Sequence, residues 1–492
     1  MFSNWFIRDW FKVASLLGNA VFGMLILAVS CDLARGELTV ENLVGTAIAG
    51  VGPFYQDVDD AIKEFAKNDF AKALEHLASA KKSTPRLAPA EVMMARLYWD
   101  NGQPGPGITM LEKAIQKMPQ DPEALVLLGE RAAAEGRITE AGLLFEKAAK
   151  LLDKFNENPR RKQNLQVRTY TTWAGVEEKS ENWSEAQKRL DELLKIEPRS
   201  GLGHESLGRV LFRLGKQKEA YAEFQAAAEY DKTILPAELA MATLAADKPK
   251  AEQWLKLAIQ KSGQDLRTRL GVTQFQLRNN NVDEAKIHAE EAIKMDPTGL
   301  DSNTWMGIIS RMLGDYKKAE KHLSLAHLLA PTNSAIIDHL ALSLIELPDK
   351  VSQQRALQFA ELNVQQYPNN HDLLPTLGWV NYKLNRRAEA SRAFTAVINS
   401  PSGVASRSPA MAYYLATVAK ERGRNADAVQ YLTEALNHNE PFPYRKPAQE
   451  LLAQLSKLEK SNAKSAKRQS GATKSEVKAE DSVSKTDADS TK

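Results

Sequence analysis

The sequence contains a single cysteine, Cys31, among 492 residues. One cysteine excludes an internal disulfide framework, and the sequence has no Cys-x-x-Cys pair or cysteine–histidine cluster for a structural metal site. Neither sign of charge is in excess, since 65 lysines and arginines oppose 62 aspartates and glutamates for a formal net charge of +3. This near balance argues against a dedicated nucleic-acid-binding protein.

The sequence also lacks the short motifs that build common catalytic sites. It has no GxxxxGK[ST] phosphate loop, no HExxH metal motif and no GxSxG nucleophile motif. His322 and His327 are five residues apart and do not share a helix face well, which disfavours zinc binding there. Asp59, Asp60 and Asp153 are interpreted as helix-end or solvated carboxylates. We therefore predict a protein with no catalytic activity, cofactor, bound metal or small-molecule substrate.

What the sequence does contain is a helical hairpin, most clearly in residues 125–148. Leu128 and Ala132 recur at helical spacing before a central turn, and a second apolar stripe containing Phe145 follows the turn. Gly129 is small enough to let a neighbouring helix approach closely. Neither helix could bury a two-sided apolar surface alone, so the hairpin must pack against others.

The small residue that begins the second helix returns along the chain at a nearly constant interval. Six of the ten steps between its copies equal 34 residues. Seven residues after most copies comes an alanine, and a proline that stops the helix often follows five residues later. The copies are Ala73, Gly107, Ala141, Ala186, Ala220, Ala251, Ala285, Ala319, Ala356, Ala390 and Ala428.

This order of small residues, helix break and aromatic residue, with its period of 34, resembles the tetratricopeptide repeat. The resemblance implies an all-α fold, namely a right-handed α-solenoid of about eleven helical hairpins over residues 54–446. It also implies that the first helices of the hairpins form a concave surface that binds partner proteins.

Residues 1–36 differ from the rest of the chain. Arg8 and Lys12 precede an uncharged run at residues 13–31, which is close to the ~20 residues needed to cross a bilayer. Two interpretations stay open, a signal peptide that is removed and a transmembrane anchor that is retained. In both, the basic end stays in the cytoplasm and the repeats lie on the extracytoplasmic, periplasmic side.

Cys31 ends this run, directly after Val29 and Ser30. The arrangement resembles the bacterial lipoprotein signal, in which a cysteine that follows small residues is lipidated, although Ala28 stands where that signal has leucine. Cys31 is thus a candidate lipidation site, and the alternative is a membrane-buried thiol without a role.

The remaining segments flank the repeats. Residues 37–53 are predicted to form a stalk or linker, and residues 447–459 a helix that caps the last hairpin. Residues 460–492 contain no aromatic residue and are predicted to be a disordered polar tail. Within the repeats, the extra residues at 153–165 predict a lengthened helix end and a polar loop, and the Pro-Gly-rich residues 103–107 predict a second helix that starts late.

The family's register places its groove positions on first helices of this chain. Arginine forks beside aromatic faces suit an extended partner segment with acidic side chains or a free carboxylate. The alternative is that the aromatic residues pack between repeats and the arginines are ordinary surface. The candidates are Arg96, Trp99, Arg168, Arg209, Phe212, Arg213, Arg267, Gln274, Arg278, Arg311, Trp379, Tyr382, Lys383, Tyr413 and Lys420.

The predicted function is that of a non-catalytic scaffold of the cell envelope that binds other proteins in this groove. An alternative is an accessory or regulatory subunit of an envelope enzyme complex that acts on polysaccharide or peptidoglycan. In either case, we expect contact with the membrane only through the N-terminal helix, and no nucleic-acid partner.

Overall fold

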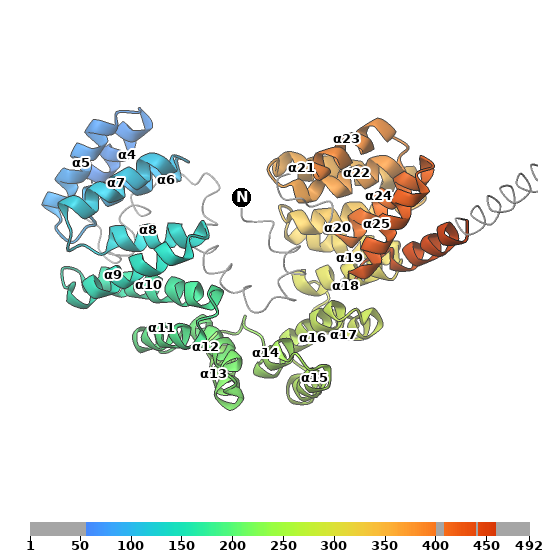
Figure 1. Cartoon of the computed structure of the whole chain (residues 1–492), viewed down its shortest axis with the longest axis horizontal. Helices are drawn as coiled ribbons and strands as arrows, with labels where there is room; N and C mark the ends of the chain where they lie inside the picture. The colour runs from blue at the N-terminus through green and yellow to red at the C-terminus, as the bar shows by residue number, and fades with distance from the viewer. Residues whose placement is uncertain (1–55, 400–407, 439–440, 459–492) are drawn as a thin grey trace, which may run out of the picture. The chain divides into compact units, whose positions relative to one another are not determined.

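The structure, a computed structural model of the chain, describes residues 56–399, 408–438 and 441–458. Within these ranges the regular elements are α-helices and one short 3-10 helix, with no strand. Consecutive helices pack in pairs, and the pairs stack on one another within each part of the chain (Figure 1). The all-α repeat fold predicted from the sequence is confirmed.

Contacts along the chain define two compact units, and the first ends at Gly263. The hairpins of this N-terminal unit are α4 (Gln56–Ala66) with α5 (Phe70–Ser83), α6 (Ala90–Asp100) with α7 (Pro104–Lys117), α8 (Glu123–Ala134) with α9 (Ile138–Lys154), α10 (Pro159–Lys179) with α11 (Trp183–Ile196), α12 (Gly201–Arg213) with α13 (Gln217–Tyr230), and α14 (Ala237–Leu244) with α15 (Lys248–Ser262).

The C-terminal unit begins at Gln264. Residues 445–458 form its last described helix, in which Leu455 is buried and Leu451 packs against the core. Its hairpins are α16 (Leu266–Arg278) with α17 (Val282–Met295), α18 (Leu300–Met312) with α19 (Tyr316–Leu329), α20 (Ser334–Leu344) with α21 (Lys350–Gln366), α22 (Leu374–Lys383) with α23 (Arg387–Ile398), and α24 (Pro409–Glu421) with α25 (Asn425–Asn437); the 3-10 helix η3 (His371–Leu373) precedes α22.

The small residues of the repeat lie where helices cross. Every copy of the first small residue, from Ala73 to Ala428, is buried. Glycines on the first helices allow an even closer approach: a Cβ added at Gly129 would lie 2.7 Å from Phe145, and one at Gly208 would lie 2.8 Å from Phe224. Large side chains of the second helices thus pack directly against the backbone of the first, which is the steric reason for the periodic small residues.

The turns inside the hairpins share one backbone feature. The second residue after the first helix commonly has a positive φ, such as 78° at Gly136 and 77° at Gly215. Glycine adopts this conformation without a steric cost, and asparagine replaces it at Asn280 and Asn385.

One local prediction is wrong and another is confirmed in part. α7 begins at Pro104 rather than late, because proline is well suited to the first turn of a helix, where its missing N–H is not needed. Near residues 153–165 the predicted lengthened end of α9 is present, but the loop that follows it is limited to residues 155–158. α9 ends at Lys154, and α10 begins at Pro159 after the Asn158 side chain accepts a hydrogen bond from the Arg161 amide at 3.1 Å, so most of the insertion is helical.

First helices of successive hairpins also contact one another. α8 contacts α10 in the N-terminal unit, and α18 contacts both α16 and α20 in the C-terminal unit. We call the first helices of each unit its first-helix layer, and this layer carries the predicted groove residues.

The predicted signal or anchor helix, the stalk, Cys31 and the polar tail lie outside the described residues. Among the residues that are described, no helix is both long enough and apolar enough to span a bilayer.

Candidate functional site

Three of the four predicted groove arginines of the N-terminal unit are paired with carboxylates of neighbouring first helices. Arg168 donates to both carboxylate oxygens of Glu130, from Nε at 2.8 Å and from Nη2. Arg209 binds Glu178 at 3.1 and 3.3 Å, and only 6% of Arg209 is exposed. We call these three interhelical pairs the Arg–Glu ladder: Arg96–Glu123, Arg168–Glu130 and Arg209–Glu178.

A further arginine, Arg161, extends the ladder at α8 and α10. Its guanidinium group lies 2.5 Å from Glu123 and 2.6 Å from Asp121, and all three side chains are buried. Burial alone would raise the pKa of the Glu123 carboxyl, but the guanidinium groups of Arg96 and Arg161 outweigh it and lower the pKa to about 2. The ladder therefore holds charged groups in the protein interior.

The other candidates of this unit pack against neighbouring side chains. The Trp99 indole donates to the Pro104 carbonyl at 3.3 Å and fills the space beside Gly107. Phe212 is half-buried against the core. Arg213 lies over the Trp183 ring at 5.8 Å, an arrangement that stabilises a cation.

In the C-terminal unit, the candidates on α16 and α18 differ in exposure. Arg267 pairs with Asp265 at 2.9 Å and stays partly exposed. Gln274 and Arg278 are half-buried, and burial lowers the pKa of Arg278. Arg311 is buried, with 5% of its surface exposed.

The aromatic candidates of the C-terminal unit, Trp379, Tyr382 and Tyr413, pack together with two further tyrosines. Trp379 is stacked between Tyr414, at a centroid distance of 4.2 Å, and Tyr382, at 5.2 Å. Tyr413 stacks on Tyr444 at 4.9 Å, and Tyr444 in turn meets Trp379 edge-on at 5.7 Å. We call these five residues the aromatic cluster.

One carboxylate, that of Glu346, accepts hydrogen bonds from the aromatic cluster. It accepts hydrogen bonds from the Trp379 indole at 3.2 Å and from the Tyr444 hydroxyl at 3.0 Å, and it pairs with Lys383 at 2.9 Å. Lys420 is exposed at the end of α24.

The structure thus divides the candidates by accessibility. Arg209, Arg311, Trp379 and Tyr382 are less than 10% exposed and have a packing role, as the alternative interpretation proposed. Partner binding stays a prediction for candidates that keep exposed surface, among them Arg267, Lys383 and Lys420.

A pocket of about 400 Å³ lies beside Tyr382, between α22, α23, α24 and α25. Three arginines and one glutamate line it, above an apolar floor that includes Phe394 and Leu415. We call this the arginine pocket. Its charged lining residues are Arg387, Arg422, Arg424 and Glu421.

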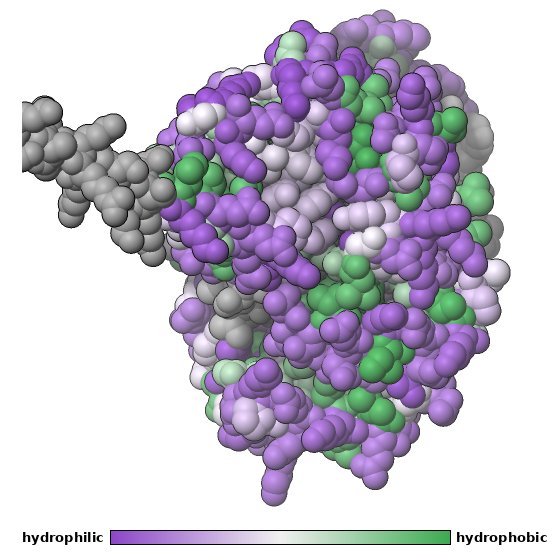
Figure 2. Space-filling model, turned by 90° about the vertical axis from the view of Figure 1, so that its right-hand side faces the viewer, coloured by the Kyte–Doolittle hydropathy of each residue, from purple (hydrophilic) through white to green (hydrophobic). Residues whose placement is uncertain are grey.

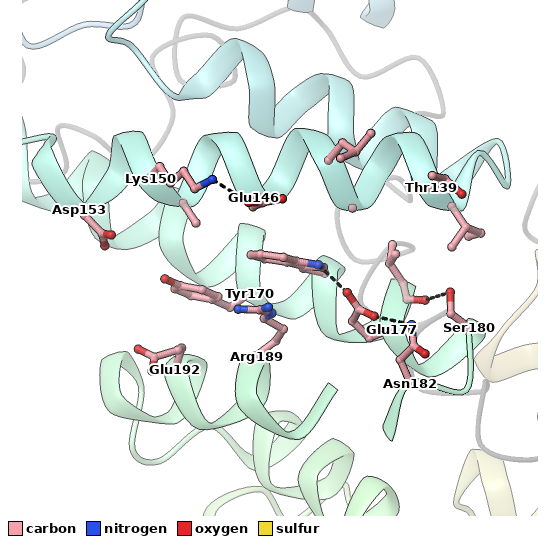
Figure 3. Close-up of a pocket in the computed structure, with 16 residues that line it drawn as sticks. Thr139, Glu146, Lys150, Asp153, Tyr170, Glu177, Ser180, Asn182, Arg189 and Glu192 are labelled. Carbon is pink, nitrogen blue, oxygen red and sulfur yellow. Dashed lines mark hydrogen bonds and ion pairs between the residues drawn. The ribbon is translucent and has the colours of Figure 1, made fainter. Parts of the chain in front are cut away.

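A second and larger space, a groove of about 830 Å³, lies between α9, α10 and α11 (Figure 3). Four carboxylates line it against two cations, and we call it the acidic groove. Sequence analysis does not predict it, because it lies between the second helices of adjacent hairpins rather than on the first-helix layer. The insertion before α10 and the aromatic pair Tyr170 and Trp173 are the only signals that could have pointed to it.

Neither site resembles a metal centre. Within the described part of the chain, no three side chains of histidine, cysteine, aspartate or glutamate are arranged to hold a metal ion. His322 instead contacts the Asn303 side-chain oxygen at 2.8 Å.

Comparisons with known proteins agree with the repeat architecture. The tetratricopeptide-repeat family matches residues 92–159, 172–233 and 376–445. No curated protein matches the sequence. The helical hairpins and their periodic small residues define an α-helical repeat protein. The three matched regions are tetratricopeptide repeats, and such repeats support a general role as a protein–protein interaction scaffold.

Several solved structures resemble the chain at low sequence identity. Yeast Tom70 shares 13% identity over 83% of this chain and 96% of that chain, with a TM-score of 0.33. A human IFIT1 dimer with PPP-AAAA shares 13% identity over 82% and 81%, with a TM-score of 0.38. PilF of Pseudomonas aeruginosa shares 16% identity over 49% and 94%, with a TM-score of 0.30. Scores in this range carry no inference about partners.

Proposed function

We propose that the protein is a non-catalytic scaffold of the cell envelope that binds an acidic segment of a partner protein in the arginine pocket. The observation that carries this proposal is the excess of guanidinium groups over carboxylates around an apolar floor. A segment with both acidic and apolar side chains matches such a lining, because arginine binds carboxylates through paired, charge-assisted hydrogen bonds.

The arginines of the pocket are held loosely enough to accept a new partner. Arg387 lies over the Tyr382 ring at 4.2 Å and 3.3 Å from Glu421, and about half of its side chain is exposed. Arg424 is similarly exposed and pairs with Asp427 at 3.4 Å. Exposed ion pairs contribute little to stability, so exchanging a carboxylate of the protein for one of a partner costs little.

The surface around the repeats also favours recognition by charge. The face shown in Figure 2 is mainly hydrophilic, and its hydrophobic residues gather in small, separate patches. A partner that depended on a broad apolar contact would find little matching surface on this face.

The envelope location rests on the basic flank and the uncharged run at residues 13–31. A reporter that is active only in the periplasm should therefore work when fused after residue 60, and a reporter that requires the cytoplasm should not. The opposite result would contradict the envelope part of the proposal without affecting the pocket.

The pocket is tested with a fluorescein-labelled peptide of alternating glutamate and leucine, followed by fluorescence anisotropy. Replacing two of the three pocket arginines, Arg422→Glu and Arg424→Glu, should weaken binding about tenfold or more, because two charge-assisted contacts become repulsive. The matched control reverses two arginines outside the pocket, Arg386→Glu and Arg392→Glu. Equal binding by the pocket variant and the wild type would overturn the assignment, as would an equal loss in the control.

A further inference from the structure

The acidic groove has the size and the walls of a binding site on a side of the N-terminal unit that the proposed function does not use. Its volume of about 830 Å³ is bounded by α9, α10 and α11 (Figure 3). Trp173 and Tyr170 form part of the wall from α10, and each is less than 10% exposed. Leu143 of α9 adds a hydrophobic surface that is 57% exposed. A space with aromatic walls and an exposed leucine suits a segment that carries apolar side chains.

Most of the polar groups on one side of the groove bind one another. Glu177 accepts from the Trp173 indole at 2.9 Å and from the Asn182 side chain at 3.0 Å. The Arg189 guanidinium group lies 3.7 Å from the centre of the Trp173 ring and pairs with Glu185 at 3.0 Å. The charges on this side of the groove are therefore largely paired within the protein.

The other end of the groove carries unbalanced negative charge. The Tyr170 hydroxyl is directed between the side chains of Asp153 and Glu192 (Figure 3). Within the described residues, the structure gives the Asp153 carboxylate no ion pair, and Glu192 pairs only with Lys195, whose side chain is 68% exposed. Burial raises the pKa of Tyr170, the charges of Asp153 and Glu192 raise it further, and the Arg189 guanidinium group acts in the opposite direction.

We infer that the acidic groove binds a basic segment of a partner protein, with a lysine or arginine side chain between Asp153 and Glu192 and an apolar side chain against Leu143. The aliphatic part of that basic side chain packs against the Tyr170 ring, and its cationic end is bonded by two carboxylates. Across the whole lining, Glu146, Asp153, Glu177 and Glu192 outnumber Lys150 and Arg189, so the charge of the groove is complementary to a basic partner.

This site differs from the arginine pocket in both its unit and its charge. A scaffold with an acidic groove in one unit and a basic pocket in the other can bind two segments of opposite charge without competition between them. The inference does not rest on the proposed function, because each site can be removed by substitutions that leave the other in place.

The test uses the full-length protein and a fluorescein-labelled peptide of alternating lysine and leucine. The variant Asp153→Asn with Glu192→Gln removes the two charges and keeps the shapes of the side chains. It should weaken binding of this peptide about tenfold or more, because the cation loses two charge-assisted contacts. Raising the salt concentration should weaken wild-type binding as well.

The matched control is Glu140→Gln with Glu157→Gln. It changes the net charge of the chain by the same amount, and both residues are exposed and lie outside the groove lining. The helical circular-dichroism signal and the melting temperature should be unchanged in both variants, which shows that the fold is intact. If the groove variant binds the lysine–leucine peptide as tightly as the wild type, the inference is wrong. It is also wrong if the control loses as much affinity, since the attraction is then unspecific.

Discussion

The first-helix layers of the two units are held together by different chemistry. In the N-terminal unit the Arg–Glu ladder and Arg161 join α6, α8, α10 and α12 through buried or half-buried ion pairs. In the C-terminal unit the aromatic cluster joins α22 and α24 to the last described helix and its preceding turn, with Glu346 as its main hydrogen-bond acceptor. The same repeat motif is compatible with ion pairs and with aromatic packing. The motif fixes the small residues where helices cross, but it does not fix which side chains lie between neighbouring first helices.

The two kinds of packing should respond differently to mutation and to acid. Removing the carboxylates that pair with a buried arginine leaves an uncompensated positive charge in the interior, and removing the arginine leaves uncompensated carboxylates. Aromatic stacking depends on dispersion and ring electrostatics, which acid does not remove. The comparison therefore predicts an N-terminal unit that is sensitive to charge and a C-terminal unit that is sensitive to side-chain volume.

The largest expected effect comes from Arg161→Met. The substitution keeps much of the apolar stem but leaves Asp121 and Glu123 buried without their shared cation, which should cost about 3–5 kcal/mol of the free energy of unfolding. Urea denaturation measures the loss, and hydrogen exchange should show α8 and α10 opening first. The control is Arg137→Met, whose ion pairs with Glu135 and Glu140 are at the surface and whose loss should give no measurable change. A similar loss in both variants would remove the distinction between buried and exposed pairs.

The second effect is the loss of stability in acid. The pKa of Glu123 is lowered from 4.5 to about 2 in the folded protein, so its contribution is fully present above pH 4.5 and is lost as the pH falls through about 2. A shift of this size corresponds to about 3 kcal/mol. Hydrogen exchange between these two pH values should therefore show α8 and α10 losing protection before α22 and α24.

Glu123→Gln separates this carboxylate from all others that titrate in the same range. The variant should be less stable than the wild type at neutral pH and should lose less stability on acidification. The aromatic cluster gives the contrast, because burial and the hydrogen bond to Glu421 raise the pKa of Tyr382 to about 12, far from the acid range. If the wild type and the variant lose stability equally in acid, Glu123 does not carry the effect.

The sequence predicts the fold well because the residues that determine it lie close together within each repeat and recur from one repeat to the next. Ala220 and Gly208 stand at fixed positions in the repeat, and their burial follows from the need of two helices to approach closely. The errors occur where a breaking residue can also begin a helix. Pro104 begins α7, and Pro159 begins α10, because proline in the first turn needs no N–H donor.

The sites are predicted less well because accessibility is not local. Arg209 and Arg213 are four residues apart on one helix face, yet Arg209 is buried against Glu178 and Arg213 lies over Trp183. A carboxylate at a corresponding position of a neighbouring first helix would have signalled the pairing. The acidic groove depends on how α9, α10 and α11 pack around a helical insertion, and no single repeat contains that information.

The smallest effect is expected for Lys383→Met, which tests whether charge matters at the aromatic cluster. Lys383 is partly exposed, lies 2.9 Å from Glu346 and 5.7 Å from the centre of the Trp379 ring. Its loss should cost only about 0.2–1 kcal/mol, because an exposed pair is weak and Glu346 keeps its bonds to Trp379 and Tyr444. Trp379→Ala should instead cost about 3–5 kcal/mol, because it empties the space between Tyr382 and Tyr414. Urea denaturation of the two variants measures the two losses in the free energy of unfolding, which can then be compared directly. If Lys383→Met is as costly as Trp379→Ala, the aromatic cluster depends on its ion pair, and the two units do not differ in the way their first helices are held.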